Sequence, residues 1–250
     1  MSDGQPVRLH CFAHSGEGVF VFDHWAASTG EGVEVAPVPL PGCAARRTAP
    51  RPTTHRALLA DLLPLFTAAQ PGPYVLYGHG LGAMIAFTVT RALHEAGLPG
   101  PALLAVGACP PPQAPTPLPD VRGASDEELL HHLGAGTAVP PASDEGIWLR
   151  AMLPVLRADL ELAQALDEAA RTPSPAGALT TPLLVVASQD NPLAPPAIAE
   201  GWRQWTSGPS WLRTVPGRHF FVRDGRELPR LLGRACRVTG RLVPQSVPVG

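Results

Sequence analysis

The sequence predicts an α/β fold in which helices cover both faces of a mainly parallel sheet. Short apolar runs alternate along the chain with longer segments whose apolar residues recur at helical spacing. This alternation is typical of parallel sheets, because each parallel pair of strands needs a crossover connection. A helical segment at about 110–175 interrupts the alternation, and we expect it to be a lid insertion over one edge of the sheet.

Each expected element follows from the local pattern. Strands are expected at 7–13, 33–38, 74–77, 103–106, 183–187 and 211–215, and helices at 54–69, 81–96 and 147–170. Ser125 and Glu128 fit a capping box, which predicts the start of another helix. The pattern predicts one domain over 1–236, and the low apolar content of 237–250 predicts a flexible tail.

Composition and charge exclude several classes of function. The formal net charge is −2 and there is no basic run, so we expect no nucleic-acid partner. No apolar run is long enough to span a membrane and no secretory leader is visible, so we expect a cytoplasmic protein without a membrane partner. The four cysteines are scattered without metal-ligand spacing, and we expect no metal and no cofactor.

Three alternating glycines follow the strand at 74–77, where the chain turns into a helix. They are Gly78, Gly80 and Gly82. The α/β-hydrolases carry G-x-S-x-G at such a turn, with a serine nucleophile raised above the sheet. The outer glycines would let strand and helix approach closely, but the central position is Gly80, which has no side chain. The spacing does not fit the dinucleotide-binding pattern G-x-G-x-x-G.

Two polar residues follow later strands in the chain order of a hydrolase acid and base. Asp190 comes just after the strand at 183–187, and His219 follows the next strand. His219 is predicted to be the general base, with Asp190 fixing its tautomer. An oxyanion would need backbone N–H donors, for which the candidates are Leu81 and Ser15.

Together, these motifs resemble the type II thioesterases that accompany polyketide synthases and non-ribosomal peptide synthetases. The resemblance runs from about 9 to 221. The matching segments are 11–16, 40–42, 153–159 and 217–221, together with Trp202. The resemblance implies an α/β-hydrolase fold and a role in secondary-metabolite biosynthesis. The implied partner is an acyl thioester, a phosphopantetheine-linked acyl carrier protein or a polyketide-like small molecule. The departure is Gly80, where that family carries serine.

A glycine at the turn leaves three functions open. The backbone should tolerate it, because glycine adopts a left-handed conformation without a Cβ penalty, but no acyl-enzyme can form on it. In the first function, His219 activates a water that fills the room left by the missing side chain. In the second, His219 shuttles protons in an isomerisation, elimination or cyclisation. In the third, the protein is a pseudoenzyme that binds acyl or carrier-protein groups. We also expect Gly80→Ser to create thioesterase activity.

Overall fold

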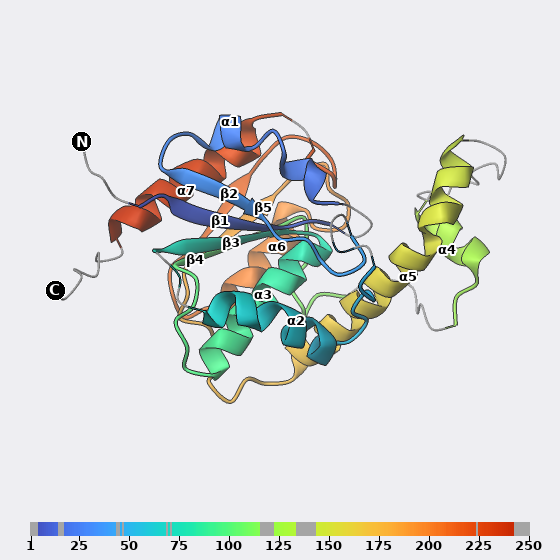
Figure 1. The fold of residues 1–250 in the computed structure, drawn as a ribbon, viewed down its shortest axis with the longest axis horizontal. Helices are drawn as coiled ribbons and strands as arrows, with labels where there is room; N and C mark the ends of the chain where they lie inside the picture. Colours follow the sequence, from blue (N-terminus) through green and yellow to red (C-terminus); the bar gives the residue numbers. More distant parts are fainter. Residues whose placement is uncertain are drawn as a thin grey trace.

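The computed structural model describes residues 5–14, 18–43, 46, 48–68, 70, 72–115, 123–133, 144–223 and 225–242. Within these residues the strands form one six-stranded sheet in the order β2-β1-β3-β4-β5-β6, and each neighbouring pair is parallel (Figure 1). The strands are β1 (Val7–Phe12), β2 (Val33–Pro37), β3 (Tyr74–His79), β4 (Leu103–Gly107), β5 (Leu183–Ala187) and β6 (Ser210–Thr214). The predicted α/β fold is therefore confirmed.

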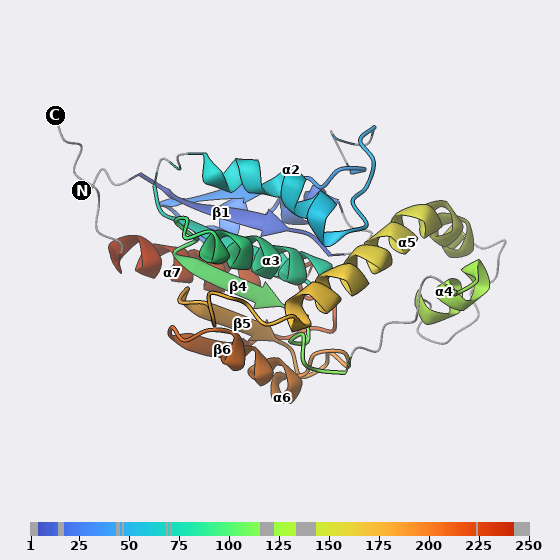
Figure 2. The same ribbon diagram turned by 90° about the horizontal axis from the view of Figure 1, so that it is seen from below.

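Helices lie on both faces of the sheet (Figure 2). The helices are α1 (Ala26–Thr29), α2 (His55–Thr67), α3 (Leu81–Glu95), α4 (Asp126–Leu133), α5 (Asp144–Arg171), α6 (Pro196–Ala199) and α7 (Glu227–Leu242), with 3-10 turns η1 (Val19–Phe22) and η3 (Glu200–Trp205). Helices α1 and α7 pack together on one face, while α2, α3 and the inner part of α5 pack together on the other. Strand order reverses direction between β1 and β3, and in such sheets ligands bind beyond the carboxyl ends of the strands at that point.

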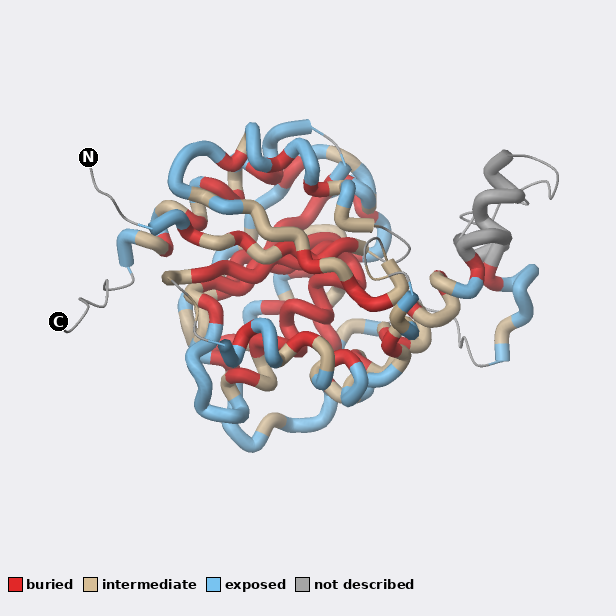
Figure 3. Tube along the Cα trace, in the orientation of Figure 1, coloured by how far each residue is buried: buried red, intermediate tan, exposed pale blue. Residues whose placement is uncertain are grey.

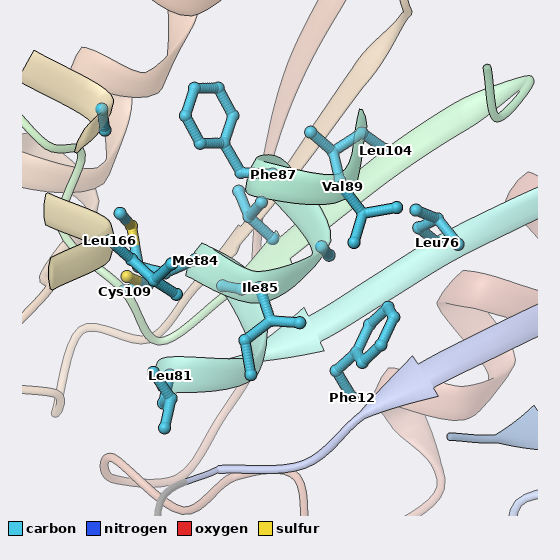
Figure 4. Close-up of a cluster of buried hydrophobic side chains, with 14 of the residues drawn as sticks. Phe12, Leu76, Leu81, Met84, Ile85, Phe87, Val89, Leu104, Cys109 and Leu166 are labelled. Carbon is cyan, nitrogen blue, oxygen red and sulfur yellow. The ribbon is translucent and has the colours of Figure 1, made fainter. Parts of the chain in front are cut away.

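The strands in the middle of the sheet are apolar on both faces because helices cover both. Every residue of β3 is buried, and successive side chains alternate between two apolar clusters. Leu76 points to the cluster under α3, while Val75 and Tyr77 point to the one under α7. Figure 3 shows this buried centre surrounded by exposed connections. Figure 4 shows the first cluster, where Ile85 of α3 lies over the sheet near Phe12.

The capping box is confirmed in detail. The Glu128 backbone N–H donates to Ser125 Oγ at 3.2 Å, and the Ser125 N–H donates to Glu128 Oε2 at 2.7 Å. These reciprocal bonds satisfy two of the donors that the first turn of α4 leaves free.

The predicted tail begins too early. Helix α7 continues through Leu242, so the helix includes residues 237–242 of the predicted tail, and residues 243–250 lie outside the described part of the chain. Leu232, Cys236 and Thr239 are buried at spacings of four and three, so one face of the helix packs on the body as far as Thr239, although Val238 and Leu242 are exposed. Arg237 also donates to the carbonyl oxygen of Thr29 at 2.5 Å, which joins α7 to α1.

The segment between β4 and β5 contains α4 and α5, and the outer part of this pair stands away from the sheet (Figures 1 and 2). A buried ion pair fastens α5 to the body: the Arg51 guanidinium donates two hydrogen bonds to Asp159, the one from Nη2 at 2.8 Å. Arg51 Nη1 also lies 2.6 Å from Cys43 Sγ. The helical insertion is thus observed, and its role as a lid remains a prediction.

Candidate active site

The turn after β3 has the backbone that its glycines predict. Gly80 has φ +56° and ψ −119°, and its N–H donates to the Gly107 carbonyl at 2.8 Å. A Cβ on Gly78 would overlap the carbonyl group of Gly82, and a Cβ on Gly82 would overlap the carbonyl of Phe12. The outer glycines therefore permit the close approach of strand and helix that we predicted.

The space beside Gly80 is occupied by the His14 imidazole. A Cβ on Gly80 would overlap His14 Nδ1 and would lie 3.0 Å from Cε1 and 3.1 Å from Cγ. His14 follows β1 and reaches this position because β1 and β3 are neighbours in the sheet. The room that we expected to hold a water beside Gly80 therefore holds a side chain.

His219 lies at the same edge, and its tautomer follows from its neighbours. The Leu193 backbone N–H donates to Asn191 Oδ1 at 3.1 Å, which identifies that atom as the oxygen of the amide. Because an amide oxygen only accepts, His219 Nδ1 carries the proton and donates it to Asn191 Oδ1 at 3.3 Å. His219 Nε2 is then left with a lone pair directed away from Asn191.

Asp190 does not take the position that the sequence suggested. Its side chain is exposed, and its backbone N–H donates to Ser188 Oγ at 3.2 Å. The next residue, Asn191, is fully buried and faces His219. The turn after β5 thus directs the Asn191 amide inward and the Asp190 carboxylate outward. The residue that contacts the His219 imidazole is therefore Asn191, one position after the predicted Asp190. A weak signal for Asn191 is present in the sequence, since Gln189 and Asn191 are both polar and both lie directly beside Asp190.

His79 is a second residue that sequence reasoning missed. Its Nε2 lies 2.8 Å from the His219 carbonyl oxygen, so this nitrogen carries a proton, and Nδ1 accepts from the Tyr77 hydroxyl at 3.0 Å. The pair of bonds fixes the backbone that carries His219. Burial lowers the pKa of His79 to about 3, which keeps the ring neutral.

His14 and His219 contact each other directly. Their Nε2 atoms are 3.1 Å apart, and the ring centroids are 4.7 Å apart. Burial lowers the pKa of His219 to about 4, and burial together with the nearby His219 lowers the pKa of His14 well below its usual range. Both rings are therefore neutral at pH 7, and His14 Nε2–H must donate to the lone pair on His219 Nε2. This leaves the lone pair of His14 Nδ1 facing Gly80, buried and without a hydrogen-bond partner among the described residues.

A cavity of about 120 Å³ opens beside these two histidines. Its lining is mostly apolar and combines the turn after β3, the segment after β4 and the body side of α5. The lining residues include Gly80, Leu81, Met84, Cys109, Leu160 and Ala163. Trp202 supports this wall, since its Nε1–H donates to the Cys109 carbonyl at 2.8 Å.

One of the two predicted oxyanion donors can be located. Leu81 is the first residue of α3, so its N–H is among those a helix leaves without an internal partner, and Leu81 lines the cavity. Ser15, the other candidate, lies outside the described residues. The described residues include no helix that is long and apolar enough to cross a membrane. Among these residues, no group of three or more His, Cys, Asp or Glu side chains is arranged so that it could hold a metal ion.

Comparison with known proteins identifies the family. The thioesterase domain family matches residues 7–236. The chain belongs to this family. Its sequence is 31% identical over 227 residues to the probable cadicidin biosynthesis thioesterase of Streptomyces griseus, covering 88% of this chain and 60% of that protein. It is also 31% identical to thioesterase PikA5 of Streptomyces venezuelae, covering 87% of this chain and 76% of the relative.

Solved structures agree with this assignment. The thioesterase RedJ from the prodiginine biosynthetic pathway of Streptomyces coelicolor superimposes with a TM-score of 0.77 at 30% identity. The superposition covers 93% of this chain and 86% of RedJ. This thioesterase-domain chain therefore has the α/β-hydrolase fold that the sequence predicted.

Proposed function

We propose that this chain hydrolyses acyl thioesters carried on phosphopantetheine-linked carrier proteins of polyketide or non-ribosomal peptide biosynthesis. One observation carries the proposal: a neutral His219, oriented by Asn191, borders an apolar cavity that ends at the first turn of α3. The geometry supplies a base and a site for the acyl group, and Leu81 supplies an N–H for the developing oxyanion. The similarity to thioesterases of antibiotic pathways supports the choice of substrate class.

The size of the cavity suggests which acyl groups are accepted. The volume of about 120 Å³ is below the roughly 300–1,000 Å³ of typical ligand pockets, and the lining is mostly apolar, so the cavity suits a short acyl group. We propose that acetyl to butyryl groups are removed, and that longer chains require the α4–α5 insertion to move.

The test is intact mass spectrometry of carrier proteins loaded with acetyl, butyryl and decanoyl groups. We expect loss of the short acyl groups with the wild-type protein and at least a roughly 100-fold slower loss with His219→Ala, because general base catalysis typically contributes about 10²–10⁴-fold. His24 is an exposed histidine of the same chain, so His24→Ala is the matched control and should leave the rate unchanged.

A wild-type protein that leaves every acyl group in place would contradict the proposal. Carrier-protein binding without acyl loss would then favour the non-catalytic function. Conversion of the acyl group without its release would favour the proton-shuttle function.

A further inference from the structure

Outside the predicted pair of His219 and Asp190, the residue with the most unusual surroundings at this site is His14. In the hydrolase arrangement a serine at the turn after β3 hydrogen-bonds to the catalytic histidine. Here the turn carries Gly80, and the group that bonds to His219 Nε2 is His14 Nε2–H. The ring of His14 also fills the place where a side chain on Gly80 would stand. His14 thus meets both neighbours that the serine would have.

We propose that the His14 imidazole is the nucleophile of this site, a proposal that rests on the proposed function. Histidine is among the side chains that form covalent intermediates in enzymes. The hydrogen bonds fix which nitrogen attacks: Nε2 holds the proton and faces His219, and Nδ1 holds the bare lone pair beside Gly80. Both His14 and Gly80 line the cavity, so an acyl group bound there lies beside the imidazole.

The reaction is balanced with water as the only co-reactant. His14 Nδ1 forms a bond to the thioester carbonyl carbon while the proton on its Nε2 passes to His219 Nε2. The C–S bond then breaks, and the leaving thiolate takes that proton, which gives a free thiol and an acyl group on Nδ1.

In the second half, His219 Nε2 takes a proton from water as the oxygen adds to the acyl carbon. The C–N bond breaks, and the proton on His219 passes to His14 Nε2. The products are a carboxylic acid and a thiol, and both rings regain their starting tautomers.

His10 is a second histidine of the β1 segment, and its contacts differ from those of His14. Both histidines belong to the β1 segment, and each has a buried nitrogen without a hydrogen-bond partner among the described residues. His10 packs edge-on against the rings of Phe66 and Tyr74, whereas His14 contacts His219 and lines the cavity. His10 therefore provides a matched control for the loss of an imidazole from this strand.

The first experiment is chemical rescue of His14→Gly. We expect at least a roughly 100-fold loss of acyl release with no loss of fold, and recovery with saturation as free imidazole is added, because the variant has a space of that shape. His10→Ala should keep the wild-type rate within about twofold and should not respond to imidazole. The His14→Gly and His219→Ala double variant should not respond either, since the base is missing. Thermal unfolding of each variant shows that the fold is retained.

The second experiment looks for the intermediate. Rapid mixing of wild-type protein with excess acetyl-loaded carrier protein should give a burst of thiol about equal to the enzyme concentration, with acetylation of the peptide that contains His14. Wild-type turnover in His14→Gly would overturn this proposal, and so would a folded variant that imidazole does not rescue. In either case hydrolysis that still requires His219 would leave the proposed function standing.

Discussion

Two turns lie at the carboxyl edge of the sheet, one after β3 and one after β5, and they differ in how far their residues can be predicted from the sequence. After β3, the backbone is constrained so tightly that glycine is required at Gly78 and Gly82, and these constraints are visible in the sequence. After β5, Asp190 and Asn191 are adjacent and both polar, and only the path of the turn decides which one faces His219. Requirements of the backbone can therefore be predicted from sequence, while a choice between neighbouring side chains cannot.

The largest effect is expected from placing a serine in the first turn. Loss of the nucleophile in a serine hydrolase cost about 10⁶ in kcat, so restoring one can give a large gain. Because a Cβ on Gly80 overlaps His14 Nδ1, we expect Gly80→Ser with His14→Gly to hydrolyse acetyl thioesters at least roughly 100-fold faster than His14→Gly alone. Gly80→Ser alone should be less active than the double variant, because the His14 ring must move first.

The measurement is the steady-state rate of hydrolysis of a short acyl thioester mimic by the double variant, by His14→Gly and by Gly80→Ser. A double variant that is no faster than His14→Gly would show that a serine at position 80 cannot attack an acyl group at this site. A serine at this position also adopts positive φ, which costs roughly 1–3 kcal/mol of stability. The thermal stability of each variant should therefore be measured together with its rate.

A smaller effect is expected at the second turn, where two single variants can be compared. Asn191→Ala removes the acceptor that fixes the His219 tautomer, and we expect kcat to fall by about 100-fold, as a misplaced catalytic group can cost that much. Asp190→Ala removes an exposed carboxylate and should change kcat by less than about twofold. The reverse order of these effects would show that Asp190 turns inward when substrate binds.

The smallest effect concerns the buried His79 beneath both turns. Its pKa is lowered from 6.5 to about 3 by burial, so the unfolded chain takes up the proton at a higher pH than the folded chain does. Its contribution to stability is therefore complete above about pH 6.5 and is lost as the pH falls toward 3, by roughly 1.4 kcal/mol per pH unit.

Urea unfolding at pH 7.5, 6.5 and 5.5 measures the slope of the whole protein, which also includes His10, His14 and His219 because burial lowers their pKa values too. His79→Gln should reduce the slope by about that amount. Equal slopes in wild type and His79→Gln would mean that His79 is already protonated when folded.

The sequence by itself determined the order of strands and helices along the chain, the capping box at Ser125, the glycine turn after β3 and the place of His219 at the same edge of the sheet. These follow from local pattern, backbone sterics and chain order, which need no knowledge of distant neighbours. The tertiary structure decided that His14 fills the space beside Gly80 and that Asn191 replaces Asp190 at the imidazole. It also decided that α7 extends to Leu242. The reason is that each of these depends on which side chain from a distant segment meets a given surface, and that is settled only when the strands are laid side by side.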